Sequence, residues 1–205
     1  LPILEKYQVP ALFCITTQNI ERQRSFWWDV FYREKVKGDR LKGYSLEERK
    51  TFSPEKNEAF LIEKLGPDAM NPVGEVDRPF SIGELTAFAQ HPLVHIGNHS
   101  HRHPLFTSIS EEMMREEIEN SQALLEAWTG IRPTIFAYPN GSCSAITERV
   151  MRDCGFQYAL TTDRKWYSEA DVLSFHLGRV PMYGTRDIGD QLSVHEHGDA
   201  GWWKR

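Results

Sequence analysis

The chain has 205 residues, 40% of them hydrophobic and 12% aromatic, which is enough for one domain with a substantial core. A formal net charge of -5 at pH 7 argues against a nucleic-acid-binding surface, and no apolar run approaches the roughly 18 residues of a membrane-spanning helix. Three cysteines, at positions 14, 143 and 154, lack CxxC spacing, so we expect buried thiols rather than disulfides or a thiolate zinc site.

The first elements indicate an α/β protein. Residues 1–7 have the pattern of the last turns of a helix, but they lack an N-cap, and the chain starts at Leu1 rather than at a methionine. We therefore expect a fragment whose preceding strand and most of whose first helix are missing. Residues 11–17 are almost continuously apolar, which is typical of a buried parallel strand.

A charged and aromatic segment follows at residues 18–77, and we interpret it as a helical insertion within a single domain covering residues 1–205. The aromatic residues at 26–32 allow two interpretations. They could stack against sugar rings in a binding groove, or they could pack the insertion onto the rest of the fold. Residues 66–79, rich in proline and glycine, are expected to form a connecting loop.

The pattern from Ser81 to Glu84 predicts a capped helix that ends near residue 90, followed by a short strand at residues 93–96. Three histidines come directly after this strand, and His99 and His103 are four residues apart. Neutral imidazole is the usual nitrogen ligand of zinc, and the carboxyl ends of parallel strands are where α/β folds build their sites. The alternative is a solvated turn whose histidines bind nothing.

The remaining pattern continues the alternation of helix and strand. Residues 110–129 predict a long helix with Gly130 after its end, and residues 144–154 predict a shorter one. Strands are expected at 134–138, at 157–162 with Asp163 at its end, and at 175–180 with Arg179 within it. This order predicts a parallel sheet, either open or closed into a barrel. Residues 186–205 have no clear pattern.

Two motifs resemble those of the polysaccharide deacetylases, also called the NodB-homology family, whose members remove N- or O-acetyl groups from glycans. The motifs are Ile96-Gly97-Asn98-His99-Ser100-x-x-His103-Pro104 and Arg132-Pro133-x-x-Phe136-Ala137-Tyr138-Pro139-Asn140-Gly141. Supporting matches surround Val9-Pro10-Ala11 and Cys154-Gly155-Phe156, so the resemblance covers residues 1 to about 180. It implies an incomplete (β/α) barrel of the NodB-homology type, here without its N-terminal strand.

The resemblance also implies a divalent metal, usually zinc, held by an aspartate and two histidines, which map onto His99 and His103. Such a metal lowers the pKa of bound water and polarises the acetyl carbonyl. The backbone N–H of Asn140 would then stabilise the developing oxyanion. The family's Asp-Asp motif, which supplies the base and the third ligand, has no counterpart here, because the chain begins after it.

Three further positions depart from the family pattern. Ala137 stands where many members have an arginine that orients the base, and Arg179 is a candidate replacement. Asp163 could point into the mouth of the barrel, although a loop-capping or surface aspartate is the alternative. The family's late histidine has no obvious equivalent, because His195 and His197 do not follow a hydrophobic strand and His176 reads as a core histidine.

We therefore expect a metal-dependent hydrolase that removes acetyl groups from an N-acetylated polysaccharide or oligosaccharide. With two of the three protein ligands of a catalytic zinc, the 205-residue chain alone is expected to be inactive. One alternative is a non-catalytic glycan-binding module that kept the fold, and another is an amidohydrolase acting on small non-sugar amides. The expected partner is a glycan, without nucleic acid or a membrane span. The oligomeric state stays open, as does the compartment, bacterial cytoplasm or periplasm.

Overall fold

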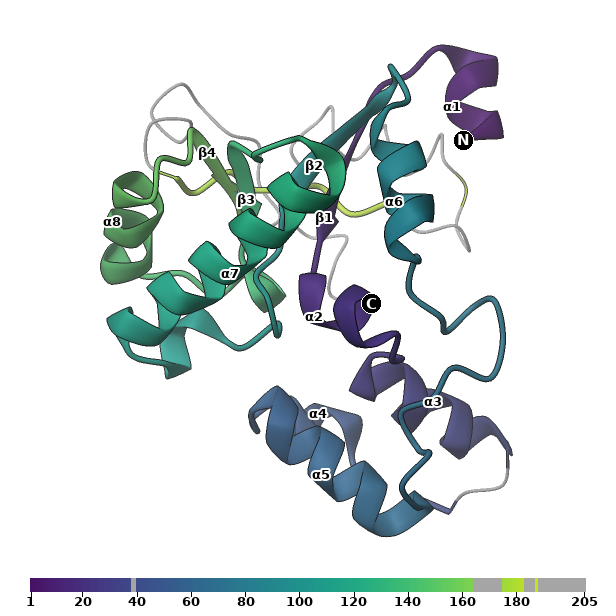
Figure 1. The fold of residues 1–205 in the computed structure, drawn as a ribbon. Coiled ribbons are helices and arrows are strands. Elements are labelled where there is room, and N and C mark those ends of the chain that lie inside the picture. The colour runs from purple at the N-terminus through teal and green to yellow at the C-terminus, as the bar shows by residue number, and fades with distance from the viewer. Residues whose placement is uncertain (38–39, 164–174, 183–186, 188–205) are drawn as a thin grey trace.

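The computed structural model describes residues 1–37, 40–163, 175–182 and 187. Its centre is a parallel four-stranded sheet in which the spatial order of the strands is their order in the sequence. The strands are β1 (Ala11–Ile15), β2 (Val94–Asn98), β3 (Ile135–Ala137) and β4 (Tyr158–Leu160). The α/β prediction is therefore confirmed, and the sheet is an incomplete (β/α) barrel (Figure 1).

Helices connect the strands as the sequence predicts. They are α1 (Pro2–Tyr7), α2 (Thr17–Arg22), α6 (Ile82–Ala89), α7 (Glu111–Thr129) and α8 (Ala145–Asp153). The predicted capping box is present at Ser81, whose hydroxyl accepts from the Glu84 N–H while the Glu84 carboxylate accepts from the Ser81 N–H. Gly130 ends α7 with a φ of 73°, as expected for a residue after a helix C-terminus. Helix α7 packs against both α6 and α8.

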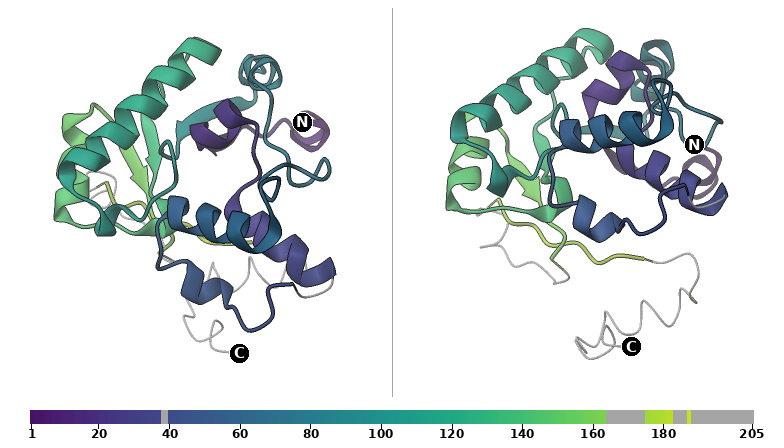
Figure 2. Two further views of the ribbon diagram at one scale, coloured as in Figure 1. Left: turned by 60° about the horizontal axis from the view of Figure 1, so that its bottom comes forward. Right: turned by 90° about the horizontal axis from the view of Figure 1, so that it is seen from below.

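Three more helices separate β1 from β2, at the position where the sequence predicts a helical insertion. They are α3 (Trp27–Lys37), α4 (Leu46–Arg49) and α5 (Pro54–Leu65). Figures 1 and 2 show that they lie beyond the carboxyl ends of the strands, away from α6 and α1. Their apolar side chains form a core cluster of their own, which includes Trp27, Phe31 and Leu61. The insertion therefore stands next to the edge of the sheet where sites are built.

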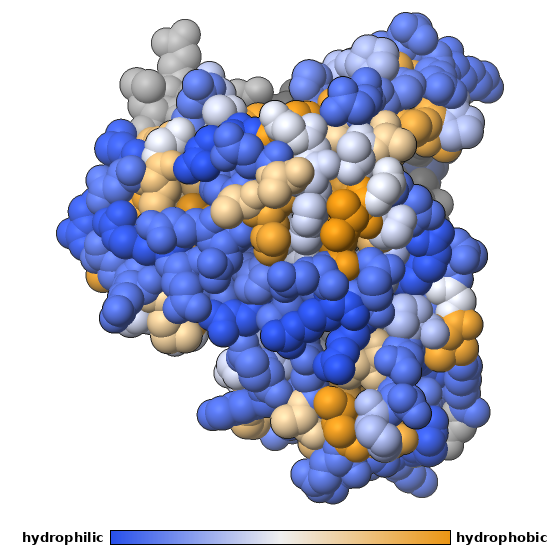
Figure 3. All heavy atoms as spheres, in the orientation of Figure 1, coloured by the Kyte–Doolittle hydropathy of each residue, from blue (hydrophilic) through white to orange (hydrophobic). Residues whose placement is uncertain are grey.

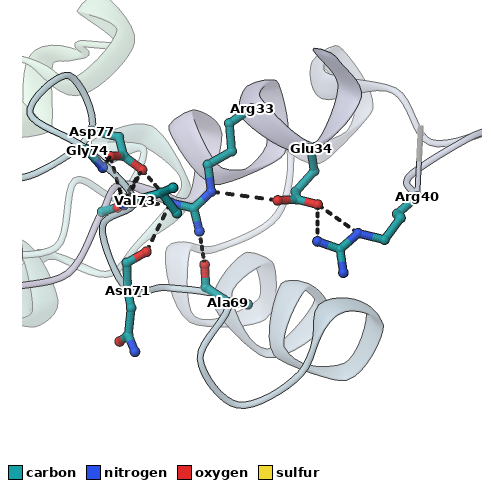
Figure 4. A network of polar contacts seen from close by, with 9 residues as sticks. Arg33, Glu34, Arg40, Ala69, Asn71, Val73, Gly74 and Asp77 are labelled. Carbon is teal, nitrogen blue, oxygen red and sulfur yellow. Dashed lines mark hydrogen bonds and ion pairs between the residues drawn. The ribbon is translucent and has the colours of Figure 1, made fainter. Parts of the chain in front are cut away.

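The insertion is also held by a network of polar contacts around Asp77 (Figure 4). The Asp77 carboxylate accepts from the Gly74 N–H at 2.8 Å and from the guanidinium of Arg33 on α3. The same guanidinium donates to the Ala69 carbonyl at 2.5 Å and to the Asn71 carbonyl at 3.0 Å. Arg33 thus connects α3 to the loop that returns the chain toward the sheet. The sequence pattern does not predict this connection.

The surface is mostly polar. Figure 3 shows hydrophilic residues over most of the face seen in Figure 1, interrupted by small, separate apolar patches. Within the described residues, no helix is both long enough and apolar enough to cross a bilayer.

The strands differ at their ends from the sequence expectation: β1 ends at Ile15 rather than at residue 17, and β4 ends at Leu160 rather than at residue 162. Strand β2 runs on to Asn98, because Gly97 lets it lie close to its neighbours: a Cβ there would meet Cys14 Sγ at 2.9 Å and the Ile135 carbonyl oxygen at 3.3 Å. The strand expected at residues 175–180 is reduced to one parallel bridge, between Leu160 and Leu177. His195 and His197 lie outside the described residues.

Candidate active site at the carboxyl edge of the sheet

The two histidines singled out in the sequence converge at the end of β2. His99 follows the strand directly, and the turn after it brings His103 back, so that the two Nε2 atoms are 3.1 Å apart. Two nitrogens bound to one tetrahedral zinc ion, with bonds of about 2.0–2.1 Å, lie roughly 3.3–3.4 Å from each other. The pair therefore has the spacing of two ligands of one metal ion.

The ring of His99 is oriented by the backbone of β3. Its Nδ1 lies 2.6 Å from the Ala137 carbonyl oxygen, which can only accept a hydrogen bond. Nδ1 therefore carries the proton, and the Nε2 lone pair faces His103. A hydrogen bond of this kind fixes both tautomer and orientation in metal-bound histidines. The acceptor is a main-chain oxygen, so the contact does not depend on the chemistry of the side chain at position 137.

The turn between the histidines is strained and well supported. Ser100 and His103 both have left-handed backbone conformations, with φ of 68° and 63°, which cost roughly 1–2 kcal/mol each for residues other than glycine. The Ser100 N–H donates to Asn98 Oδ1 at 2.8 Å, and the His103 N–H donates to Ser100 Oγ at 3.0 Å. Asn98 is itself held by Ser121 of α7, at 2.8 Å. The small polar residues of the motif thus shape the turn.

A buried carboxylate, which the sequence analysis missed, anchors the same turn. Glu117 of α7 is 0% exposed and accepts hydrogen bonds from the His101 N–H at 3.0 Å, from the Arg102 N–H at 2.7 Å and from the Arg102 guanidinium. A signal was available: Glu117 is three residues after Met114 and four before Ser121, so it lies on the stripe of α7 that faces the core. An acid on such a stripe indicates a buried partner.

Burial and nearby charges lower the pKa of both histidines and so favour the neutral form. Burial lowers the pKa of His99, and the nearby charge of Arg179 lowers it further. Burial, together with the neighbouring His99, lowers the pKa of His103 to about 3. Neutral imidazole is the form that binds metals. The third histidine of the motif, His101, points instead toward α2, with its Nδ1 2.9 Å from Thr17 Oγ1.

Of the other predicted residues, Asn140 and Arg179 lie near the pair. Asn140 sits in a tight turn (Pro139–Gly141) with a φ of 54°, and it lines the same cavity as His103. Gly141 must be glycine there, because its φ is 73° and a Cβ would lie 2.5 Å from the Thr162 nitrogen. The Arg179 Nε donates to the Thr161 carbonyl at 2.8 Å, which holds its guanidinium where its charge acts on His99.

Asp163 is placed elsewhere. Its carboxylate lies 2.5 Å from Nε2 of His176, and in the described part of the chain no carboxylate forms an ion pair with His99 or His103. The expectation that His176 is a core histidine is wrong, because its side chain is 30% exposed. Position in an apolar run did not reveal which way the ring faces, since neighbouring residues of an extended segment point to opposite sides.

Two cavities flank the histidine pair, and the insertion forms a wall of both. One, of about 290 Å³, is lined by Trp28, Lys50, Phe52, His103 and Asn140, among others. The second, of about 230 Å³, reaches both histidines and is also lined by Trp28.

The two adjacent tryptophans, Trp27 and Trp28, differ in their surroundings. The ring of Trp28 lies 4.8 Å from that of His103 and stacks on Phe26 at 4.5 Å. Trp27, in contrast, is 8% exposed and belongs to the core of the insertion. The packing interpretation holds for Trp27, and Trp28 packs against the same core while it also lines the two cavities; stacking of Trp28 on a sugar stays a prediction.

Comparison with known proteins identifies the family and the fold. The family model of polysaccharide deacetylases matches residues 1–159. The fold resembles that of deacetylase PplD from Streptococcus pyogenes, with a TM-score of 0.63, 15% identity and coverage of 95% of this chain and 62% of that one. It also resembles IcaB from Ammonifex degensii, with a TM-score of 0.57, 18% identity, and 95% and 64% coverage.

The BpsB deacetylase domain from Bordetella bronchiseptica is a further structural neighbour, with a TM-score of 0.54, 18% identity, and coverage of 87% and 63%. The chain thus spans a little under two thirds of the length of these neighbours. Their shared architecture is the (β/α) barrel of the NodB-homology type, present here in incomplete form. With a family model matched over most of its length, the chain belongs to the polysaccharide deacetylase family.

Proposed function

We propose that this chain carries the metal site of a hydrolase that removes acetyl groups from an N-acetylated polysaccharide or oligosaccharide. The observation that carries the proposal is the 3.1 Å separation of two neutral imidazole nitrogens at the edge of a cavity. Membership in the polysaccharide deacetylase family supports the reaction class.

His99 and His103 would hold a divalent cation, and zinc suits two neutral imidazole donors. When bound, the ion would supply a polarised carbonyl and a water of lowered pKa. The chain's own residues do the rest. Ala137 and Glu117 keep the two rings in place, through the His99 Nδ1 bond and the anchored turn. Arg179 is the candidate for the positive charge that orients the catalytic base.

The turn at Asn140 would stabilise the negative charge that develops on the acetyl oxygen. Asn140, which has a positive φ and is followed by Gly141, lines the cavity together with His103. A backbone N–H at this place can act as an oxyanion donor without any requirement on the side chain.

Trp28 makes a glycan the fitting substrate class. Its ring lines both cavities and lies beside His103, and Phe52 and Lys50 also line the cavity of about 290 Å³. Aromatic rings stack on the apolar faces of sugars, while a lysine offers hydrogen bonds to hydroxyl groups. Pockets with mostly apolar walls and few polar groups are the usual form of small-molecule sites.

The test is acetate release from N-acetylated oligosaccharides such as chitooligosaccharides, with zinc or cobalt supplied. It should use the natural reading frame that contains this sequence, with His99→Ala and His103→Ala as the variants. His95→Ala is a matched control, because His95 lies on the same strand but is exposed. We expect each ligand variant to lose at least a hundredfold in turnover and the control to lose nothing.

Full turnover in either ligand variant would overturn the proposal. Glycan binding without any acetate release would favour the non-catalytic module instead, and turnover of small non-sugar amides alone would favour the amidohydrolase. The 205-residue chain by itself is expected to be inactive, because two imidazoles fall short of the three protein ligands of a catalytic zinc. Acetate release by that chain would refute this expectation while supporting the proposed reaction.

A further inference from the structure

A second group of potential metal ligands includes a cysteine just after the Asn140 turn. It consists of Cys143, just before α8, Glu148 in the first turn of α8, and His176. The Cys143 Sγ atom is 3.4 Å from His176 Nδ1, and Glu148 Oε1 is 3.6 Å from the same nitrogen. All three side chains are partly buried.

The protonation of His176 makes this group unusual. The Asp163 carboxylate lies 2.5 Å from Nε2, so that nitrogen donates and carries the proton. In the neutral ring, Nδ1 then presents a lone pair toward the oxygen of Glu148 and the sulfur of Cys143. The thiol of Cys143 can donate its proton to this lone pair. When the thiol loses that proton, a thiolate, a carboxylate and an imidazole lone pair converge on one place, and together they are a donor set for a divalent metal ion.

The distances fit a metal ion. Zn–S bonds are about 2.3 Å long and Zn–N and Zn–O bonds about 2.0–2.2 Å, so tetrahedral geometry places sulfur and nitrogen roughly 3.5 Å apart, and nitrogen and oxygen roughly 3.4 Å apart. The two separations here are 3.4 Å and 3.6 Å. Asp163 completes the arrangement, because a carboxylate on the far nitrogen is the usual support of a zinc-bound histidine.

A buried hydroxyl lies beside this group. The side chain of Tyr138 is 0% exposed, and its hydroxyl has no hydrogen bond of standard geometry within the described residues. Burial, and then the nearby Cys143 and Glu148, raises the pKa of Tyr138, whereas the Thr147 hydroxyl lowers it. A thiolate or carboxylate at this place would offer the Tyr138 hydroxyl an acceptor.

We propose that Cys143, His176 and Glu148 bind a zinc ion, with Asp163 holding the imidazole from behind. One thiolate and one carboxylate balance the charge of a divalent ion, and the thiol proton is released on binding. The bound ion would fasten α8 to the segment at residues 175–182, which also carries Arg179. Its role would be structural: it would brace the chain a few residues after the turn of Asn140.

This differs from the sequence expectation that Cys143 is a small buried hydrophobe. The three ligands are 5 and 28 residues apart, a spacing that matches no known zinc motif, so only the fold brings them together. The proposal does not depend on the proposed deacetylase reaction, since the two sites share no residue.

The test titrates cobalt(II) into a His99→Ala, His103→Ala double variant, which removes the other site. We expect one ion per chain and the near-ultraviolet charge-transfer absorption that only a thiolate ligand gives. Cys143→Ser should abolish that absorption, while Cys154→Ser, a change of another partly buried cysteine, should retain it. Asp163→Asn should keep the absorption but weaken binding by roughly 10- to 100-fold.

A stoichiometric titration without the absorption, or an absorption that persists in the Cys143→Ser variant, would overturn the proposal. Absence of binding in the double variant, with its fold verified by circular dichroism, would do the same and would leave the contact between Cys143 and His176 as a hydrogen bond from the thiol. Neither result touches acetate release, so this inference and the proposed function fail separately.

Discussion

The buried carboxylate of Glu117 offers the sharpest prediction about how the histidine turn is built. It is 0% exposed and accepts three hydrogen bonds from the turn, one of them from the charged guanidinium of Arg102. In Glu117→Gln, an NH₂ group replaces one acceptor oxygen, so at least one of these bonds is lost and the guanidinium loses its charged partner. Hydrogen bonds to charged groups contribute about 1.5–3 kcal/mol, and a broken buried pair costs about 3–5 kcal/mol.

We therefore expect Glu117→Gln to lower the free energy of unfolding by about 3 kcal/mol. In a chain of this size that corresponds to a fall in Tm of roughly 6–12 °C. The matched control is Glu116→Gln, on the same helix. Its carboxylate is 58% exposed and lies 3.8 Å from the Arg102 guanidinium, and such surface pairs contribute little. Thermal unfolding followed by circular dichroism measures both. Equal shifts in the two variants would refute the anchoring role of Glu117.

Two further predictions concern Gly141 and Glu84. Gly141→Ala should destabilise the fold by more than about 2 kcal/mol, because its Cβ would lie 2.5 Å from the Thr162 nitrogen. The control is Gly155→Ala, where φ is also positive but a Cβ would meet open space, so the cost should be only about 1 kcal/mol. Comparable urea midpoints for the two variants would contradict this prediction. Hydrogen bonds from Arg78 and then Ser81 lower the pKa of Glu84 to about 2 from 4.5. This contribution to stability is present above about pH 4.5 and is lost as the pH falls toward 2, so the Tm difference between the natural chain and Glu84→Gln should shrink over that range.

Local patterns predicted most of the fold. The capping box at Ser81 and the left-handed Gly130 depend on residues a few positions apart, and both are present as expected. The alternation of strands and helices predicted the parallel sheet, because parallel strands need helical crossovers. Strand ends were less certain: β2 runs two residues further than expected because Gly97 fits closely against Cys14.

The candidate site was predicted only in part, because much of it depends on contacts between distant segments. The spacing of His99 and His103 predicted that both bind one metal ion, and their Nε2 atoms do lie close together. The carboxylate of Glu117, 14 residues after His103, and the pairing of Asp163 with His176 arise from packing, which no local pattern encodes. The role of these histidines as metal ligands stays a prediction.

One measurement tests that role most directly: a crystal structure of the chain grown with zinc, with anomalous data collected on both sides of the zinc absorption edge. We predict an anomalous peak bonded to Nε2 of His99 and to Nε2 of His103, at about 2.0–2.1 Å from each. A zinc-loaded crystal in which these nitrogens keep their 3.1 Å contact without an ion, or in which either ring turns away, would contradict the account.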